Sequence, residues 1–189
     1  MKDKLAKVIS IITIAPVMAL IMLLFLYIAR HDMFGSPLFL LIAVLSLSVI
    51  PTLGYPLQYV FPVLREGGRD EQRKLAFISA VAGYMFGVIM AILLKAPVSY
   101  KMILISYALS GTVLALFNIC HIKASGHACG VGGPAVLCSY FLGGYGWLVL
   151  LLIPAIFWAR LHMKRHRLPE LVLGSAISII SACVVIDLF

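Results

Sequence analysis

Charged residues are scarce in this chain. Only 12% of its 189 residues are Asp, Glu, Lys or Arg, whereas 63% are hydrophobic and the mean hydropathy is +1.10. This balance lies well outside that of a soluble domain. The four cysteines form no CxxC pair and say little about the redox compartment. The composition therefore predicts a protein that resides in a bilayer.

Strands of alternating polarity, which are typical of membrane barrels, are also missing. Several apolar runs instead approach the roughly 20 residues that a helix needs to cross a bilayer. The sequence thus predicts one integral membrane domain over 1–189, an all-α bundle of six to seven transmembrane spans. We expect these spans at 8–29, 37–63, 75–94, 102–119, 128–143, 146–160 and 169–188.

The first apolar run, from Val8 to Ala29, follows the basic segment MKDKLAK and resembles the start of a signal peptide. The hydrophobic region of a signal peptide has only ~7–15 residues. This run is longer, so we interpret it as a retained first span.

Two later runs contain helix breakers. In the second run, Pro51, Gly54 and Pro56 predict a kink or an early unwinding of the helix. The stretch from Ala128 to Trp158 is too long for one span and short for two. Its midpoint contains LGGYG, whose glycines predict two short spans folded back on each other.

Basic residues are distributed unevenly between the two ends of these spans. All but three of the fifteen lysines and arginines share a side with the N-terminus, the exceptions being Arg30, Lys95 and Lys101. The positive-inside rule predicts that this side is cytoplasmic, in what we expect to be the cell membrane. Cations gathered around an anionic substrate would bias the count in the same direction. The net charge of +8 is thus explained without a nucleic-acid partner.

Three loops on this side supply the groups that phosphoryl transfer needs. These groups are cations and backbone N–H groups for the phosphate oxygens, a nucleophile in line with the leaving oxygen, and an acid for the leaving alcohol. The loops are 64–74, 120–127 and 160–168, and with the start of the last helix they contribute His127, His166, Arg160, Arg73 and Glu170.

The spacing of these residues supports that chemistry. Ser125 and Gly126 precede a helix start near His127, where N–H groups and the helix dipole favour an anion. A plain N-cap and turn explain Ser125 and Gly126 equally well. His166 and Glu170 lie four residues apart across the start of the last helix. The carboxylate can therefore hold one ring nitrogen and orient the other for attack.

Two short motifs in this region are ASGH at 124–127 and R-x5-H-x3-E from Arg160 to Glu170. They resemble signature motifs of the type 2 phosphatidic acid phosphatase superfamily, whose patterns are PSGH and SR-x5-H-x3-D. Ala124, Ala159 and Glu170 replace the Pro, Ser and Asp of those patterns.

The first motif of that superfamily, K-x6-RP, is matched poorly. Arg73 takes the position of the arginine, whereas Glu66 stands at the lysine and Lys74 at the proline. The resemblance covers roughly residues 65–175 and is carried by the other two motifs.

The resemblance implies a metal-independent phosphatase that needs no cofactor and has the helical core of the superfamily. His166 would attack phosphorus to form a phosphohistidine, Glu170 would orient it, and His127 would protonate the leaving group. Water would then hydrolyse the intermediate. The residues that would cradle the phosphate are Arg160, Ser125, Gly126, Arg73, Lys74, Arg69 and Lys123.

Other polar residues have simpler interpretations. We assign Lys164, Arg165 and Arg167 to snorkelling at the membrane interface or to contacts with lipid headgroups. Asn118, near the end of the fourth span, is interpreted as an interhelical hydrogen-bond partner.

Four Cys and His residues near the start of the fifth span do not indicate a zinc site, because they match no usual ligand spacing. We therefore expect no metal. The residues concerned are Cys120, His121, His127 and Cys129.

Two functions are compatible with the sequence. The leading hypothesis is a phosphatase for a membrane lipid phosphate or polyprenyl diphosphate, whose chain lies between spans while its phosphate meets the basic loops. The alternative is a non-catalytic protein that binds or moves anionic lipid, and the imperfect first motif favours it. Against it stand His127, His166 and Glu170, because binding alone needs cations and amides rather than an oriented nucleophile and a separate acid.

Overall fold

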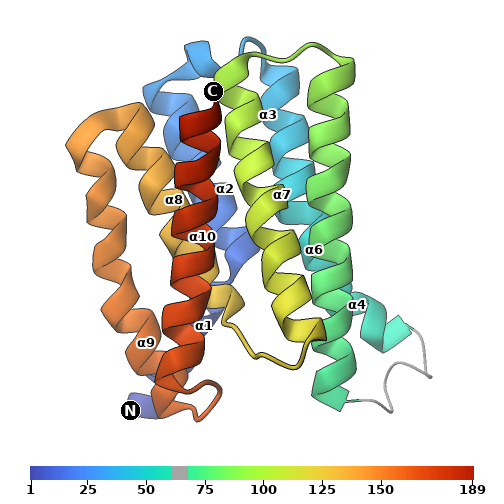
Figure 1. The fold of residues 1–189 in the computed structure, drawn as a ribbon. Coiled ribbons are helices and arrows are strands. Elements are labelled where there is room, and N and C mark those ends of the chain that lie inside the picture. The colour runs from blue at the N-terminus through green and yellow to red at the C-terminus, as the bar shows by residue number, and fades with distance from the viewer. Residues whose placement is uncertain (61–67) are drawn as a thin grey trace.

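Every regular element in the described part of the chain is a helix. A computed structural model describes residues 1–60 and 68–189, without the side chains of Tyr55, Gln58, Tyr59, Val60, Arg69 and Asp70. The helices pack in one bundle, with the two termini at opposite ends (Figure 1). Their bounds are α1 (Lys2–Ile12), α2 (Ala15–Ala29), η1 (His31–Met33), α3 (Pro37–Val44), η2 (Leu45–Val49), α4 (Ile50–Val60), α6 (Gly68–Leu93), α7 (Val98–Ile119), α8 (Gly126–Leu142), η3 (Gly143–Leu151), α9 (Leu152–His162) and α10 (Leu168–Leu188).

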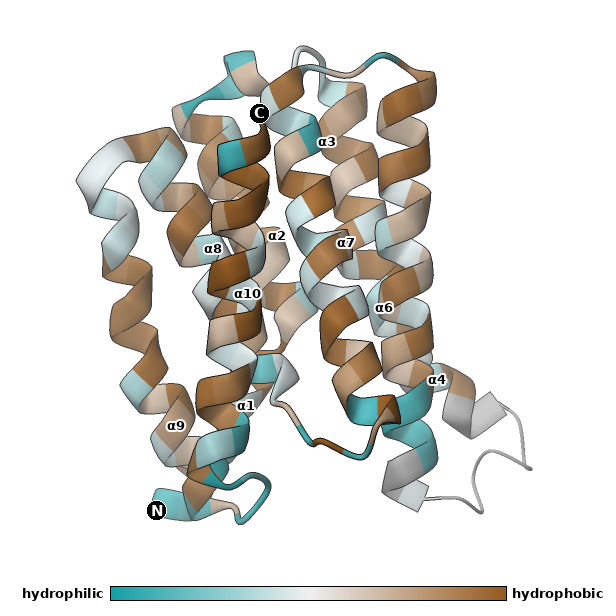
Figure 2. Cartoon of the chain, viewed as in Figure 1, coloured by the Kyte–Doolittle hydropathy of each residue, from teal (hydrophilic) through white to brown (hydrophobic). Residues whose placement is uncertain are grey.

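Several of these helices are suited to a membrane. Among the described residues, five helical segments are long and apolar enough to cross one, and the bent pair of α1 and α2 makes a sixth. Figure 2 shows hydrophobic residues along the bodies of α6, α7 and α10, and hydrophilic residues around the ends of the bundle. The long candidate Gly126–His162 has 37 residues, more than one span requires. The chain reverses direction within it, so that α9 runs back beside α8 (Figure 1).

The first predicted span, 8–29, is wrong as a continuous helix. The structure has two helices, α1 and α2, bent by 59° at Thr13 and Ile14. Pro16 explains the break, because it lacks an N–H group and its ring would clash with the carbonyl four residues earlier. Ile14 accordingly adopts an extended conformation (φ −64°, ψ 144°) as the N-cap of α2.

The second predicted span, 37–63, departs from α-helical geometry earlier than its prolines suggest. The π-helical turn η2, Leu45–Val49, separates α3 from α4, and Pro51 follows directly in the first turn of α4. A proline removes a backbone hydrogen bond one turn before itself, and a π turn accommodates such a loss. The helix continues through Gly54 and Pro56 to Val60. Residues 61–63 lie outside the described part of the chain.

The two short spans predicted at 128–143 and 146–160 differ from the structure at their junction. Helix α8 ends at Leu142, and the 3₁₀ helix η3 carries the chain to Leu151 before α9 begins. Gly146 packs against the backbone of α8, since a Cβ there would lie 2.1 Å from the nitrogen of Ser139. Gly146 therefore marks a tightly packed contact with α8, and a 3₁₀ helix takes the place of the expected two-residue loop.

Helix α10 packs closely against the turn before α8 at Gly174. A Cβ on Gly174 would lie 2.3 Å from the carbonyl oxygen of Ser125. The Ser125 N–H donates to the carbonyl of Glu170, at 2.9 Å, in the same region. The contact therefore fixes the start of α10 against the start of α8.

Replacing Gly174 with alanine is expected to destabilise the fold by about 1–3 kcal/mol, because the methyl group forces these backbones apart. Thermal unfolding in detergent should show a Tm lower by several degrees. Gly144→Ala is the matched control, since a Cβ at Gly144 would meet no atom within 4 Å. An unchanged Tm in both variants would contradict the close contact.

Candidate functional site

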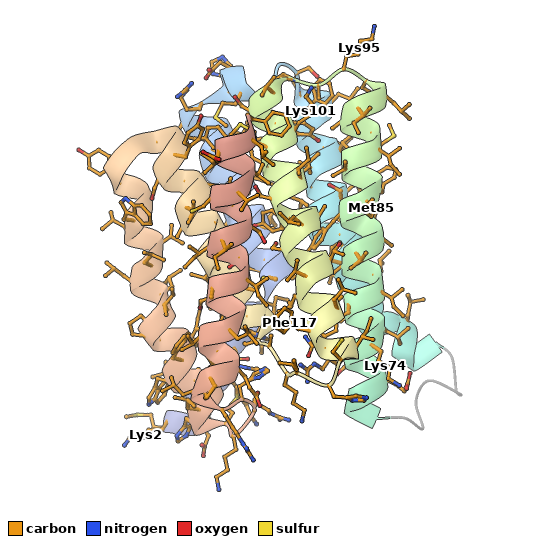
Figure 3. The ribbon with its side chains drawn as sticks, viewed as in Figure 1. Lys2, Lys74, Met85, Lys95, Lys101 and Phe117 are labelled. Atoms are coloured by element: carbon orange, nitrogen blue, oxygen red, sulfur yellow. The ribbon has the colours of Figure 1, made fainter. Side chains whose placement is uncertain are left out.

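A cavity lies at the end of the bundle that carries the N-terminus. Its volume is ≈ 910 Å³, within the range of sites that hold a small molecule. Figure 3 shows nitrogen-bearing side chains gathered at this end, where Lys2 and Lys74 are labelled, whereas Lys95 and Lys101 mark the opposite end. Six of the predicted site residues line the cavity: Arg73, Lys123, Gly126, His127, Arg160 and His166.

His166 and Glu170 form a hydrogen-bonded pair beside this cavity. His166 lies in the turn between α9 and α10, and Glu170 lies in the first turn of α10, which begins with Leu168 and Pro169. His166 Nδ1 is 2.6 Å from Glu170 Oε2, and the two side chains are only 8% and 19% exposed. A carboxylate accepts this hydrogen bond, so Nδ1 carries the proton. The lone pair of the neutral ring is then on Nε2.

The environment of His166 favours the neutral ring. Burial lowers the pKa of His166 below its ordinary value of 6.5, and the positive charges of Arg160 and Arg73 lower it further. The hydrogen bond and the negative charge of Glu170 act in the opposite direction, but the net shift of the pKa is downward. The imidazole is therefore uncharged at neutral pH, as a nitrogen nucleophile must be.

Ser125 is the N-cap of α8. Its Oγ accepts from the N–H of Ala128 at 3.5 Å, and the residue is fully buried. The structure thus contains the capping interaction, one of the two interpretations that the sequence allowed. Gly126 differs from Ser125, because it lines the cavity at the N-terminal end of α8, where the positive end of the helix dipole lies.

Ser10 of α1 connects two of the predicted site residues, and nothing in the sequence indicates its role. Arg160 Nη1, from the last turn of α9, donates to Ser10 Oγ at 2.8 Å. His127 Nε2, from α8, lies 3.0 Å from the Ser10 carbonyl oxygen and 3.3 Å from Ser10 Oγ. A serine within an apolar run carries no functional signal by itself, so only the fold reveals this contact.

Arg73 on α6 is held at the edge of the cavity by three contacts. Its Nη2 donates to Asn118 Oδ1 on α7 and to the carbonyl of Ala124, at 3.4 Å for the latter. Its guanidinium also lies over the ring of Phe77, 5.7 Å from the centroid. The prediction that Asn118 is an interhelical hydrogen-bond partner is confirmed. Asn118 additionally orients a cation of the candidate site.

The other lysines and arginines of this region differ in whether they line the cavity. Lys74 is not part of the cavity lining, and its exposed Nζ pairs with Glu71 Oε1 at 2.6 Å. This follows from helix geometry, because adjacent residues on a helix point in different directions. The side chain of Arg69 lies outside the described residues. Lys164 and Arg165, which the sequence assigned to the membrane interface or to lipid headgroups, line the cavity.

Within the described residues, no group of three or more His, Cys, Asp or Glu side chains is placed to hold a metal ion. Cys120 is exposed and Cys129 is buried in α8. The described side chains that line the site or adjoin it include two histidines, a carboxylate and several cations.

Comparison with models of protein families, with curated proteins and with solved structures finds no match to this chain. Its function must consequently be inferred from its own residues and their geometry.

Proposed function

We propose that this chain is a membrane-embedded phosphatase that hydrolyses a lipid phosphate or a polyprenyl diphosphate through a phosphohistidine, without a metal ion. The observation that carries this proposal is the hydrogen bond of 2.6 Å between His166 Nδ1 and Glu170 Oε2 beside a cavity lined by cations. A site that only bound anionic lipid would need the cations and not this pair. The pair therefore favours catalysis over lipid binding or transport.

In the proposed reaction His166 Nε2 attacks phosphorus, and a P–N bond forms as the bond from phosphorus to the leaving oxygen breaks. The electron pair goes to the leaving oxygen, which takes a proton from the protonated ring of His127. Arg160 and Arg73 balance the charge on the phosphate oxygens. Glu170 retains the Nδ1–H and stabilises the positive charge of the ring. Water then attacks phosphorus and gives a proton to His127, the P–N bond breaks, and inorganic phosphate leaves as the neutral imidazole of His166 is restored.

The shape of the cavity supports a substrate with a hydrocarbon chain. The cavity continues from the basic end into the bundle along one face of α6, where Arg73, Phe77, Ala80 and Tyr84 line it. From Arg73 to Tyr84 this face extends about 16 Å, at ~1.5 Å per helical residue. This distance is about half of the ~30 Å hydrocarbon thickness of a bilayer. A phosphate at the cations could thus place its chain inside the bundle.

The first test is release of inorganic phosphate by the detergent-purified protein, with and without EDTA. The substrates to compare are phosphatidic acid, phosphatidylglycerophosphate and an isoprenyl diphosphate. We expect release that EDTA does not reduce, because the proposed nucleophile is a side chain rather than a metal-bound water. The substrate that is hydrolysed fastest identifies the lipid class.

Two outcomes would contradict the proposal. Release that EDTA abolishes would indicate a metal-dependent reaction. No release from any of the three lipids by folded protein, together with their binding, would favour the alternative of a protein that binds or moves anionic lipid.

A further inference from the structure

The broken N-terminal helix leaves the backbone carbonyl of Ser10 without its usual helical partner. Helix α1 ends at Ile12, so the carbonyl of Ser10 belongs to its last turn. The Ile14 N–H, which would bond Ser10 in a continuous helix, donates to Ile11 instead, at 3.5 Å. Pro16 causes this break, and the carbonyl of Ser10 is thereby directed to a side chain.

That side chain is the imidazole of His127. A carbonyl oxygen only accepts hydrogen bonds, so the 3.0 Å contact with His127 Nε2 requires the proton on Nε2. The lone pair of the neutral ring then lies on Nδ1. In the proposed reaction Nδ1 is therefore the atom that takes up a proton from the attacking water and gives it to the next leaving group, while Nε2 keeps its own proton. The Ser10 carbonyl would act on His127 as the Glu170 carboxylate acts on His166.

The hydroxyl of Ser10 acts on a different residue. Arg160 Nη1 donates to Ser10 Oγ at 2.8 Å, and Ser10 is only 9% exposed. An arginine has donors and no acceptor, so Oγ accepts this bond. Because the guanidinium is planar, fixing one of its nitrogens restricts the directions in which the others can meet a phosphate.

Helix α1 is also attached to α9 at its other end. Asp3 Oδ1 lies 2.8 Å from His162 Nε2, and Ala6, one turn before Ser10, is fully buried. The indole of Trp158 stacks on the ring of His162, with centroids 5.3 Å apart. These contacts hold α1 against α9, so that Ser10 is presented to the site by a packed helix rather than by a loose terminus.

We propose that Ser10 is a positioning residue of this site: its carbonyl fixes the tautomer of His127, and its hydroxyl orients Arg160 for phosphate. This inference rests on the proposed function for its catalytic meaning. The tautomer of His127 and the orientation of Arg160 can each be measured without catalysis.

The hydroxyl is tested with a matched pair of variants, Ser10→Val and Ser10→Thr, which have side chains of similar shape and differ in the hydroxyl group. We expect Ser10→Val to weaken binding of inorganic phosphate about tenfold and to raise KM by a similar factor, with a smaller change in kcat. Ser10→Thr should stay within about threefold of the unaltered protein in both measurements. Calorimetry with inorganic phosphate and steady-state kinetics provide these values.

Thr13→Val is the control for loss of a buried hydroxyl in this segment. Thr13 Oγ1 donates to the carbonyl of Ile9 at 2.7 Å, a local bond one helical turn away. We expect this variant to retain the phosphate affinity. If Ser10→Val is no more impaired than Thr13→Val, the role assigned to the Ser10 hydroxyl is wrong.

The carbonyl is tested by nitrogen-15 NMR of histidine-labelled protein, with the His127 signals assigned by their loss in His127→Gln. We expect the proton on Nε2, both in the unaltered protein and in Ser10→Val, since that substitution keeps the carbonyl. A proton on Nδ1 would overturn this part of the inference. If no lipid is hydrolysed, the proposed function fails, while phosphate affinity and the NMR spectrum still decide the role of Ser10.

Discussion

Replacing His166 with alanine is expected to lower kcat by at least about a thousandfold. The variant lacks the nitrogen that attacks phosphorus, and the cations that remain can bind phosphate but cannot form the covalent intermediate. Steady-state phosphate release measures this loss. Denaturation of the protein during turnover of a phosphorus-labelled substrate should trap labelled protein with unaltered His166 and none with alanine.

Controls separate this loss from misfolding, because the His166 side chain is only 8% exposed. His166→Gln is a second variant that retains a polar side chain and should be equally inactive. His31→Ala should leave activity unchanged, since His31 is exposed in η1 at the opposite end of the bundle. A folded His166→Ala protein that keeps more than about a tenth of the activity would exclude His166 as the nucleophile.

The long helices could be predicted closely from the sequence, because an apolar run of sufficient length has few alternatives in a bilayer. The expected spans 102–119 and 169–188 correspond to α7 and α10, and the starts of these helices differ by one to four residues. Helix α6 begins at Gly68, seven residues before the expected Leu75. Its charged first turns were assigned to a loop, although Glu, Gln, Arg and Lys all favour helices.

The breaks within helices were harder to place. Pro16 stands inside an apolar run whose hydropathy predicts one continuous span, so its effect on α1 and α2 was missed. Pro51 was recognised as a helix breaker, but the distortion lies in the preceding turn, at Leu45–Val49. In both cases the proline acts on the residues about one turn earlier, where the carbonyl that it cannot bond is located.

Local spacing predicted the one part of the candidate site that a single helical turn can build. Residues four apart at a helix start are neighbours, and the structure has the expected hydrogen bond between His166 and Glu170. The contacts of Ser10 with His127 and Arg160 join residues 117 and 150 positions apart. No pattern in one sequence reveals such contacts, because they depend on how α1, α8 and α9 pack.

Replacing Glu170 with glutamine is expected to lower kcat by a factor on the order of 10²–10⁴, the range in which loss of an orienting carboxylate changes histidine catalysis. An amide can accept the Nδ1–H but can also donate to Nδ1, which would place the ring proton on the attacking Nε2. The substitution also removes the negative charge that stabilises the positively charged ring of His166 when phosphorus is bound to it. Glu170→Asp keeps the carboxylate with one methylene less and should retain more activity than Glu170→Gln.

The pH dependence of kcat/KM distinguishes this role of Glu170 from a purely structural one, because it reports the pKa values of the free enzyme. Attack requires neutral His166, whose pKa is lowered chiefly by burial, so activity should fall only as the pH drops through a value below 6.5. Glu170 acts to raise that pKa through its hydrogen bond and its charge. Glu170→Gln should therefore move the acidic limb to still lower pH, whereas Glu170→Asp should leave it closer to that of the unaltered protein. A limb that moves to higher pH in Glu170→Gln would show that the carboxylate does not act on the titration of the nucleophile.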